Sequence, residues 1–293
     1  MMCLRSKLIL SPFSLRTFIE HLPYHRPNSF KFTANTRKSL ITATPINSSH
    51  FETLNSHQKH QISLYVDTLL EWNQKMNLTA VTERSEVMER HIEDSLAILP
   101  PMNESYTSHC GSSCESLSLV DVGTGAGLPG LILAIACPGW KVTLLESMNK
   151  RCLFLEHAIN VTGVSNVKVI RDRAENFGHT LEFRESFDIA VARAVAELRV
   201  LAEYCIPLVR MGGLFVAAKG HDPQVEVRNA ERAINLLGAT LLHQHLVESH
   251  GPFGQRTAII CFKDRPTSRK YPRSPVWQLA SVLHLGDLSY ILM

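Results

Sequence analysis

Short apolar runs alternate with longer amphipathic segments along the chain from residue 117 onward. The apolar runs predict strands at Leu117–Val122, Lys141–Leu145, Val167–Ile170, Phe187–Ala192 and Leu214–Ala218. Helical segments are predicted between these strands at residues 128–137, 149–161, 197–206 and 223–237. Because strands that alternate with helices form βαβ units, this pattern predicts an α/β fold with helices on both faces of a mostly parallel sheet.

The last two apolar segments have no helix between them. Leu241–Glu248 and Arg256–Phe262 are separated by a short stretch that contains His250-Gly251-Pro252-Phe253-Gly254. Glycine and proline at such a position are typical of a turn. We therefore expect an antiparallel hairpin that completes a seven-stranded sheet and ends the α/β domain, which we place at residues 119–262.

The residues before this domain predict a helical extension over 51–102. One helix is expected at 56–76 and a second at 85–98, with Ser56 and Ser85 as their caps and Pro100-Pro101 ending the second. Leu64, Leu69, Trp72 and Met76, with Ile62 and Tyr65, recur at helical spacing in the first helix and suggest one apolar face. We expect Trp72 and Met76 to pack in the core. Residues 103–118 are rich in Ser and lack periodicity, which predicts a loop.

The overall composition excludes several classes of protein. The chain has 293 residues, of which 45% are hydrophobic and 19% charged, so it is not globally disordered. No apolar run approaches the roughly 18 residues of a membrane-spanning helix. The seven cysteines are scattered without a CxxC pair, so we expect neither a disulfide framework nor a metal site.

The first fifty residues differ in charge from the rest of the chain. They contain seven Lys or Arg, one acidic residue and twelve Ser or Thr, so the remaining 243 residues carry a net charge of −3. This composition is typical of an organelle transit peptide, which is disordered, although an untargeted tail remains the alternative. The excess of Ser and Thr over Arg favours a chloroplast over a mitochondrion. Any nucleic-acid binding must then come from a local basic patch.

A glycine-rich loop that follows the first predicted strand is the main chemical signal. Gly123, Gly125 and Gly127 allow a sharp turn and a close approach to a ligand, at the start of a helix whose amides face that ligand. The loop matches the GxGxxG pattern of an NAD-dependent oxidoreductase, with Glu146 as a ribose-binding acid. It also matches the pattern of S-adenosylmethionine (SAM) methyltransferases. Asp121, on the strand before the loop, suits the cationic SAM better than a pyrophosphate.

Several motifs occur together and in a fixed order between residues 57 and 273. They are Leu70-Glu-Trp72-Asn73-Gln-Lys-Met-Asn77-Leu78-Thr79, Arg90-His91-Ile-Glu-Asp94-Ser95-Leu96, Val120-Asp-Val-Gly-Thr-Gly-Ala-Gly-Leu-Pro-Gly130, Glu146-Ser147, Lys150-Arg151, Arg173-Ala174-Glu175, Arg193-Ala194, Lys219-Gly220 and Tyr271-Pro272-Arg273. With these motifs the sequence resembles the RsmG (GidB) family, bacterial methyltransferases that methylate N7 of a guanine in small-subunit ribosomal RNA. Together with the N-terminal composition, the resemblance implies a chloroplast-type member of that family.

The resemblance implies a Rossmann-like class I methyltransferase fold with an N-terminal helical extension, and a set of SAM contacts. The contacts carried over by residue are Gly123, Leu128, Ala174, Glu175 and Arg193. The residues themselves add Asp121, Gly125, Gly127 and Glu146. Glu146 could instead be a solvated strand end, Glu175 a favourable acid at a helix start, and Arg193 part of a structural ion pair.

The implied reaction needs little from side chains. A neutral guanine N7 has a lone pair and no proton, so no general base is required, and the protein must mainly align the reactants. We therefore expect no catalytic triad, and the sequence assigns no catalytic residue. The candidates for positioning the base and its phosphates are Asn77, Arg90, His91, Lys150, Arg151, Arg193 and Lys219. The alternatives are that Asn77 closes a turn, that His91 lies in the core, and that Lys150 and Arg151 are a solvated helix start.

The C-terminal residues 263–293 form a tail that departs from the family pattern after Arg273. Its first part, Lys263–Arg273, is basic and contains Tyr271, so it could contact phosphates and stack on a base, or it could be solvated. The expected partner is small-subunit ribosomal RNA or the small ribosomal subunit, and the protein is expected to be a monomer. A ribosome assembly factor that keeps the fold without catalysis is a further alternative.

Overall fold

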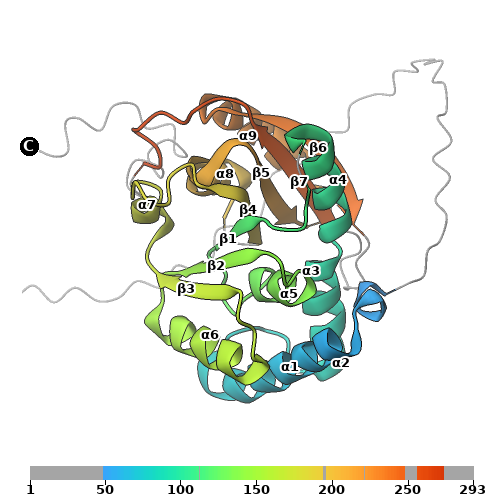
Figure 1. Cartoon of the computed structure of the whole chain (residues 1–293). Helices are drawn as coiled ribbons and strands as arrows, with labels where there is room; N and C mark the ends of the chain where they lie inside the picture. The colour runs from blue at the N-terminus through green and yellow to red at the C-terminus, as the bar shows by residue number, and fades with distance from the viewer. Residues whose placement is uncertain (1–48, 112, 194–195, 221, 248–255, 274–293) are drawn as a thin grey trace, which may run out of the picture. The chain divides into compact units, whose positions relative to one another are not determined.

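The computed structural model describes residues 49–111, 113–193, 196–220, 222–247 and 256–273. Within these ranges a seven-stranded sheet forms the centre of the molecule (Figure 1). Its strands are β1 (Ser118–Val122), β2 (Lys141–Glu146), β3 (Val167–Arg171), β4 (Phe187–Arg193), β5 (Val209–Lys219), β6 (Ala239–Val247) and β7 (Arg256–Lys263). None of the helices in these ranges has the length and apolar character needed to cross a membrane.

The strand order is β3-β2-β1-β4-β5-β7-β6. The first five strands are parallel, whereas β7 runs antiparallel to both β5 and β6. The mostly parallel α/β sheet and its closing antiparallel pair are therefore confirmed. The chain order reverses between β1 and β4, and open α/β sheets bind their ligands at the carboxyl ends of strands at such a point.

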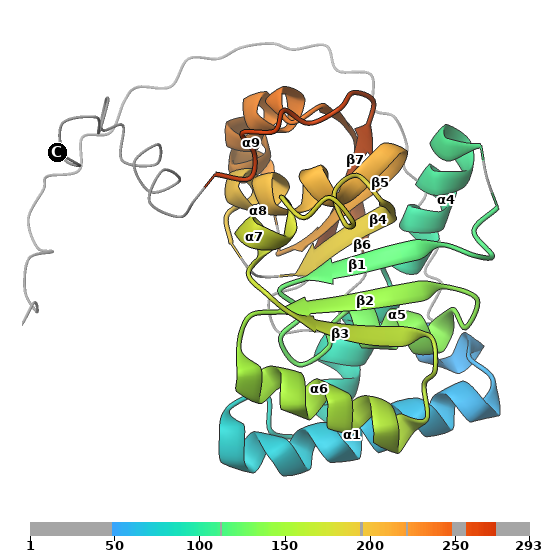
Figure 2. The ribbon, with the colours of Figure 1, turned by 60° about the vertical axis from the view of Figure 1, so that its left-hand side comes forward.

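Helices cover both faces of the sheet, as Figures 1 and 2 show. One layer holds α1 (Ser56–Met76), α5 (Gly130–Ala136) and α6 (Asn149–Thr162), and the other holds α7 (Ala174–Phe177), α8 (Leu198–Cys205) and α9 (Gln224–Leu236). Successive strand residues point to opposite faces. Ile189 and Val191 of β4 accordingly pack in the first layer, and Ala190 and Ala192 in the second.

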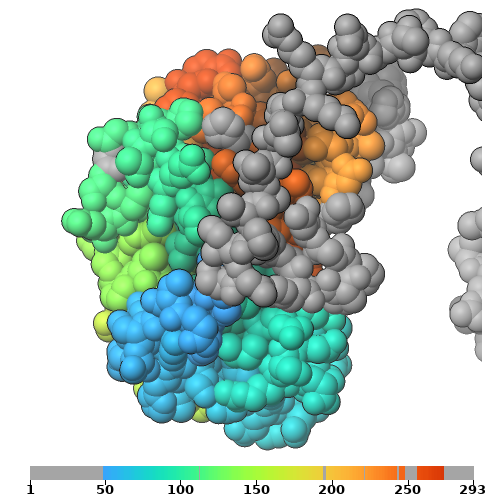
Figure 3. Space-filling model, turned by 90° about the vertical axis from the view of Figure 1, so that its right-hand side faces the viewer, coloured from blue at the N-terminus to red at the C-terminus, as the bar shows by residue number. Residues whose placement is uncertain are grey.

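The helical extension packs on the first layer, where α1 contacts α5 and α6, and α4 (Leu99–Cys110) lies against β5 and β7. The ring centroid of Trp72 in α1 lies 5.7 Å from that of Phe154 in α6, and Met76 packs against the same core, so both core predictions are confirmed. In the space-filling view the blue residues of η1 (His50–Thr53) and α1 lie beside the teal residues that follow them (Figure 3).

The cap predictions for the first two helices are wrong. Asn55 caps α1 in a capping box with Gln58, so Ser56 is already inside the helix. The second helix begins at Arg84, with Glu83 as its N-cap residue, so Ser85 lies in its first turn. It is made of α2 (Arg84–Val87), the π-helical segment η2 (Met88–Glu93) and α3 (Asp94–Leu96), and wide turns of this kind are frequent at functional sites.

The predicted loop at 103–118 is wrong over its first half. Helix α4 (Leu99–Cys110) runs through it and buries Met102, Ser105 and Tyr106 along one face. Pro100 and Pro101 occupy the first turn of α4, where the missing N–H groups have no helical partner in any case. The two prolines therefore start a helix, instead of only ending the one before it.

Several side chains of the basic segment Lys263–Arg273 are held by contacts within the protein, whereas Arg269 and Lys270 are exposed. Lys263 is 1% exposed, and its Nζ donates to Glu185 at 2.9 Å and to the carbonyl of Ile206. Arg273 binds both carboxylate oxygens of Glu203, and Tyr271 packs against the second core layer. These side chains hold the segment against the sheet, so the prediction that they contact RNA phosphates is wrong for Lys263 and Arg273.

Candidate functional site

The glycine loop joins the carboxyl end of β1 to α5. Gly123, Gly125 and Gly127 have φ of 70°, 61° and 92°, a region that side chains with a Cβ rarely adopt, and this explains the repeated glycines. The N–H groups of Gly123 and Thr124 both donate to the carbonyl of Leu145, at 2.9 and 3.1 Å. The loop is thus fixed to the end of β2.

Asp121 holds the glycine loop in its conformation through two hydrogen bonds. Its side chain is fully buried, and Oδ2 accepts from Thr124 Oγ1 at 2.5 Å and from Gly130 N at 2.8 Å. Burial raises the pKa of Asp121 to about 6, although both hydrogen bonds lower it. A Cβ on Gly130 would lie 2.7 Å from Asp121 Cβ, so only glycine allows this approach. Asp121 acts on the loop, and its carboxylate does not line the adjoining cavities.

Glu146 ends β2 and faces the same loop. Its Oε2 accepts from Gly125 N at 3.1 Å, and its Oε1 accepts from Met148 N at 2.8 Å. Arg151 Nη1 lies 3.6 Å from Oε2. Each carboxylate oxygen keeps a further lone pair, so binding to a ribose hydroxyl stays a prediction.

Three cavities adjoin at this edge of the sheet. The loop cavity, about 380 Å³, is bordered by the glycine loop and Glu146. The α7 cavity, about 280 Å³, shares Gly123 and Ser147 with it, and the β7 cavity, about 230 Å³, shares His91 and Arg193 with it. Together they form one cleft along the carboxyl ends of the central strands, where the topology predicts a ligand site.

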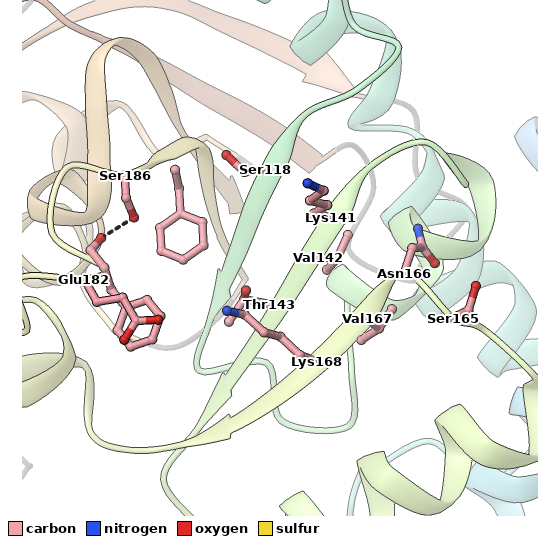
Figure 4. Close-up of a pocket in the computed structure, with 12 residues that line it drawn as sticks. Ser118, Lys141, Val142, Thr143, Ser165, Asn166, Val167, Lys168, Glu182 and Ser186 are labelled. Carbon is pink, nitrogen blue, oxygen red and sulfur yellow. Dashed lines mark hydrogen bonds between the residues drawn. The ribbon is translucent and has the colours of Figure 1, made fainter.

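A larger cavity, about 450 Å³, lies elsewhere. It is lined from the amino ends of the strands, by residues such as Ser118, Lys141 and Val167, and by Phe183 and Phe187 (Figure 4). Its lining contains no residue of the glycine loop. This cavity is therefore separate from the cleft, despite its greater volume.

The expected SAM contacts converge on the cleft with two exceptions. Those that line it are Gly123, Gly125, Leu128, Glu146, Ala174, Glu175 and Arg193. Glu175 is 8% exposed and accepts from Arg173 Nη2 at 3.1 Å and from the Tyr204 hydroxyl at 3.3 Å. Asp121 and Gly127 support the loop from outside the cleft. A Cβ on Gly127 would lie 3.1 Å from Leu155, so this glycine serves close packing.

Most of the substrate-positioning candidates also line the cleft, and two do not. Arg90, His91, Arg151, Arg193 and Lys219 line the cleft. Asn77 is the C-cap of α1 with φ of 50°, so it closes the turn before α2, as its alternative stated. Lys150 is exposed in the first turn of α6 and is absent from the linings of the three cavities.

Lys219 is held in place by contacts within the protein. Its Nζ donates to the carbonyl of Ala196 at 2.6 Å and to Glu226 Oε1 at 2.5 Å. Glu226 also accepts from the backbone N–H of Leu198. The lysine therefore ties the chain after β4 to α9 at the wall of the cleft.

His91 is held in one uncharged form. Its Nδ1 lies 3.0 Å from the carbonyl of Arg90 and must donate to it, so Nε2 accepts from Thr79 Oγ1 at 2.7 Å. The Thr79 hydroxyl oxygen in turn accepts from Val81 N. Burial, and then Arg193, lower the pKa of His91 to about 4. The imidazole is neutral near pH 7.

We expect the His91 imidazole to make the free energy of unfolding pH-dependent. Because its folded pKa of about 4 lies below the unfolded value of 6.5, the unfolded state binds more protons between these values, and stability is lost as the pH falls through this window. Between pH 7 and pH 5 the loss is at most about 2 kcal/mol. Urea unfolding of the wild type and of His91→Gln at both pH values measures it. An equal pH dependence in both proteins would contradict the expectation.

Three residues that the sequence did not assign support the site. Tyr65, buried in α1, donates from its hydroxyl to the carbonyl of Ala126 in the glycine loop at 2.7 Å. Asp94 Oδ2 accepts from Arg256 Nε at 3.0 Å in the wall of the β7 cavity. Asp94 follows Arg90 by four residues in the helical stretch, so both lie on one helix face. Because Arg90 was a candidate, this spacing could have indicated that Asp94 also belongs to the site.

The contacts of the loop bear on which cofactor it can hold. The N–H of Gly125 is bound to Glu146, that of Gly130 to Asp121, and those of Gly127 and Leu128 to the carbonyl of Thr124. A pyrophosphate needs free amides at this position. Acidic Glu146 and Glu175 also line the cleft. The residues fit the cationic SAM and disfavour NAD, and no cluster of metal-ligating side chains occurs among the described residues.

Comparisons with known proteins identify the family of the chain. Residues 58–256 match the family described as rRNA small subunit methyltransferase G (GidB). The Ribosomal RNA small subunit methyltransferase G of Staphylococcus epidermidis is 43% identical over 222 residues, which cover 76% of this chain and 89% of that protein. The proteins of the same name from Alkaliphilus metalliredigens and Bacillus cereus are 42% and 41% identical, over 76% of this chain and 89% and 90% of theirs.

Proposed function

Because the chain belongs to the rRNA small subunit methyltransferase G family, we propose that it transfers a methyl group from SAM to N7 of a guanine in small-subunit ribosomal RNA. The observation that carries this proposal is that the cavities adjoin. The glycine loop and Glu175 line the cofactor end of the cleft, and the loop cavity shares His91 and Arg193 with the β7 cavity, whose lining holds no part of the loop.

The side chains of the cleft suit a reaction by alignment. SAM supplies an electrophilic methyl group on a sulfonium, and the N7 lone pair needs no deprotonation before it attacks. His91 Nε2 is occupied by the Thr79 hydroxyl, and Lys219 is bound to Glu226, so neither is poised as a general base. Arg90, Arg193 and Arg256 outnumber Asp94 in the lining of the β7 cavity, so the substrate end carries net positive charge, which favours the approach of anionic RNA.

Methyl transfer by the purified full-length chain tests the proposal. We expect labelled methyl from SAM to appear in small-subunit RNA that lacks the modification, and at N7 of a single guanine after digestion. Gly123→Asp should abolish SAM binding, because it places a side chain at φ of 70° and a negative charge in the loop. Binding to the subunit without transfer would instead support an assembly factor, and binding of NAD in place of SAM would support an oxidoreductase.

We further propose that the protein acts as a monomer in an organelle, with the chloroplast preferred to the mitochondrion. The basic, Ser- and Thr-rich composition of residues 1–50 supports the organellar location; residues 1–48 lie outside the described ranges. A fluorescent protein fused to residues 1–50 should enter the organelle, whereas a fusion that begins at residue 51 should not. A cytosolic signal from the first fusion would reject the proposed location, and light scattering checks the monomer.

A further inference from the structure

Two arginines in the lining of the β7 cavity have accessible donors without a partner. The side chains of Arg90 and Arg256 are 25% and 33% exposed. Arg256 donates from Nε to Asp94, whereas its two Nη groups make no hydrogen bond within the part of the chain that the structure describes. The Nη groups of Arg90 make none there either, since Glu86 Oε1 is 3.7 Å from Nη1. Only Nε of Arg90 is both buried and unpartnered in these two side chains, so all four Nη groups are accessible.

The side-chain acceptors in the same lining are not available to a ligand. Asp94 is 6% exposed, its Oδ2 accepts from Arg256 Nε at 3.0 Å, and its Oδ1 is buried. The Thr257 hydroxyl is buried as well, and His91 Nε2 accepts from the Thr79 hydroxyl. A guanidinium group can donate but cannot accept. The hydrogen-bonding capacity that side chains leave accessible in this cavity is therefore mainly donor capacity.

Accessible donors without accessible acceptors suit an anion better than a base. Bases carry both donors and acceptors, so a cavity that offers donors alone would leave some groups of a base unpaired. A phosphodiester group carries a negative charge and only acceptors, and arginine can bind two of its oxygens at once with parallel N–H groups. The cavity volume of about 230 Å³, the space of roughly eight water molecules, admits such a group.

The charge and the position of the cavity favour a phosphate of the RNA. Asp94 neutralises one of the three arginines in the lining, and Arg193 has no ion-pair partner among the described residues. The cavity shares His91 and Arg193 with the loop cavity, so a group bound in it lies next to the proposed cofactor site. An RNA whose target base reaches that site carries phosphates on both sides of the base.

We propose that the β7 cavity binds one phosphate group of the RNA substrate through the Nη groups of Arg90 and Arg256. The proposal rests on the methyl-transfer function above. It goes beyond a general attraction between a basic surface and RNA, because both arginines contact the same phosphate. Arg90 lies four residues before Asp94 on one helix face, and Asp94 binds Arg256 at the start of β7, so the two guanidinium groups are neighbours. Asp94 is a positioning residue that orients the guanidinium group of Arg256.

Phosphate-ethylation interference tests the shared contact, because ethylation removes the charge of single phosphates. Small-subunit RNA that lacks the methyl group is partially ethylated with ethylnitrosourea and separated into fractions bound and not bound by the full-length chain. We expect one phosphate whose ethylation weakens binding by the wild type but not by Arg90→Gln or by Arg256→Gln. Each variant should bind the intact RNA about tenfold more weakly, the value of a hydrogen bond to a charged group.

Two controls separate this phosphate contact from other effects. The Kd for SAM should be unchanged in Arg90→Gln and Arg256→Gln, because neither arginine lines the loop cavity. Arg232→Gln removes an exposed arginine of α9 that lines none of the three cavities. It should keep the interference pattern and the RNA affinity of the wild type.

The possible outcomes distinguish the phosphate site from the proposed function. If the two variants lose interference at different phosphates or at none, while the wild type transfers methyl to the RNA, the phosphate site is overturned and the proposed function stands. If Arg256→Gln does not fold, the double variant Asp94→Asn/Arg256→Gln, which removes both charges of the pair, takes its place. A wild type that neither binds the RNA nor transfers methyl to it overturns both proposals.

Discussion

Replacing Asp121 by alanine is expected to weaken SAM binding by at least about 100-fold. The change removes the acceptor of Gly130 N–H and of the Thr124 hydroxyl in a fully buried position. Each donor left without an acceptor at this buried position costs about 1–3 kcal/mol of free energy. The loop avoids this cost only by leaving the conformation in which it borders the loop cavity. Isothermal titration calorimetry with SAM at pH 7.5 measures the loss.

The matched variant is Asp121→Asn, which keeps one carbonyl oxygen as an acceptor in nearly the same volume. It should retain more SAM affinity than the alanine variant, because the Gly130 N–H can still be satisfied. Thermal unfolding of both variants separates a rearranged loop from a chain that does not fold. An alanine variant that folds and binds SAM as tightly as the wild type would show that the carboxylate does not hold the loop.

The strands were predicted well because both faces of the central sheet are buried. In β4, side chains on both faces enter the core, and the sequence is correspondingly a nearly continuous apolar run. The start of β5 was missed by five residues, since Val209–Gly213 includes two glycines that interrupt the run. A Cβ on Gly213 would lie 2.5 Å from the carbonyl oxygen of Asp188, so the neighbouring strand requires glycine there.

Helix ends were predicted less well, because they depend on single side-chain contacts. Asn55 and Ser56 are both suitable caps, and only the reciprocal bonds of Asn55 with Gln58 decide between them. Pro100 and Pro101 signal a boundary without saying on which side the helix lies. Helix α4 is favoured there because Tyr106 can donate to Asp188 while its ring is buried, a contact between residues 82 positions apart.

Contacts between residues that are far apart in sequence also limit what could be predicted of the cleft. The glycine loop was predictable because its geometry depends on residues adjacent in sequence. The pairing of Asp94 with Arg256 joins residues 162 positions apart, and the bond from Tyr65 to Ala126 joins residues 61 apart, so neither follows from local patterns. Lys219 was predictable as a cleft residue, but its engagement with Glu226 was not.

The segment Lys263–Arg273 shows why a cluster of basic residues is weak evidence for a phosphate site. Positive charge predicts phosphate binding only where it is solvent-accessible and unpaired. Glu185 and Glu203, which neutralise Lys263 and Arg273, lie 78 and 70 residues earlier in the chain. Arg184 adds bonds to the carbonyls of Thr267 and Tyr271, which fix the backbone of the segment.

Replacing Glu185 by alanine is therefore expected to lower the free energy of unfolding by about 3 kcal/mol, a typical loss when one member of a buried ion pair is removed. Lys263 is 1% exposed and would keep only the carbonyl of Ile206 and the Thr267 hydroxyl as partners. Glu185 also accepts from Thr267 N at 2.7 Å, so the segment loses a backbone anchor as well. Urea unfolding at pH 7.5 measures the change.

The second substitution Lys263→Met should recover much of this loss in the double variant, because the buried ammonium left unpaired by Glu185→Ala is then absent. Glu182→Ala, an exposed carboxylate three residues earlier, is the matched control and should change stability by less than about 0.5 kcal/mol. A loss below about 1 kcal/mol for Glu185→Ala, or a double variant no more stable than it, would show that the ion pair does not hold the segment. Because the segment lies outside the cleft linings, SAM affinity should be unchanged in every folded variant, which separates its structural role from any role in binding.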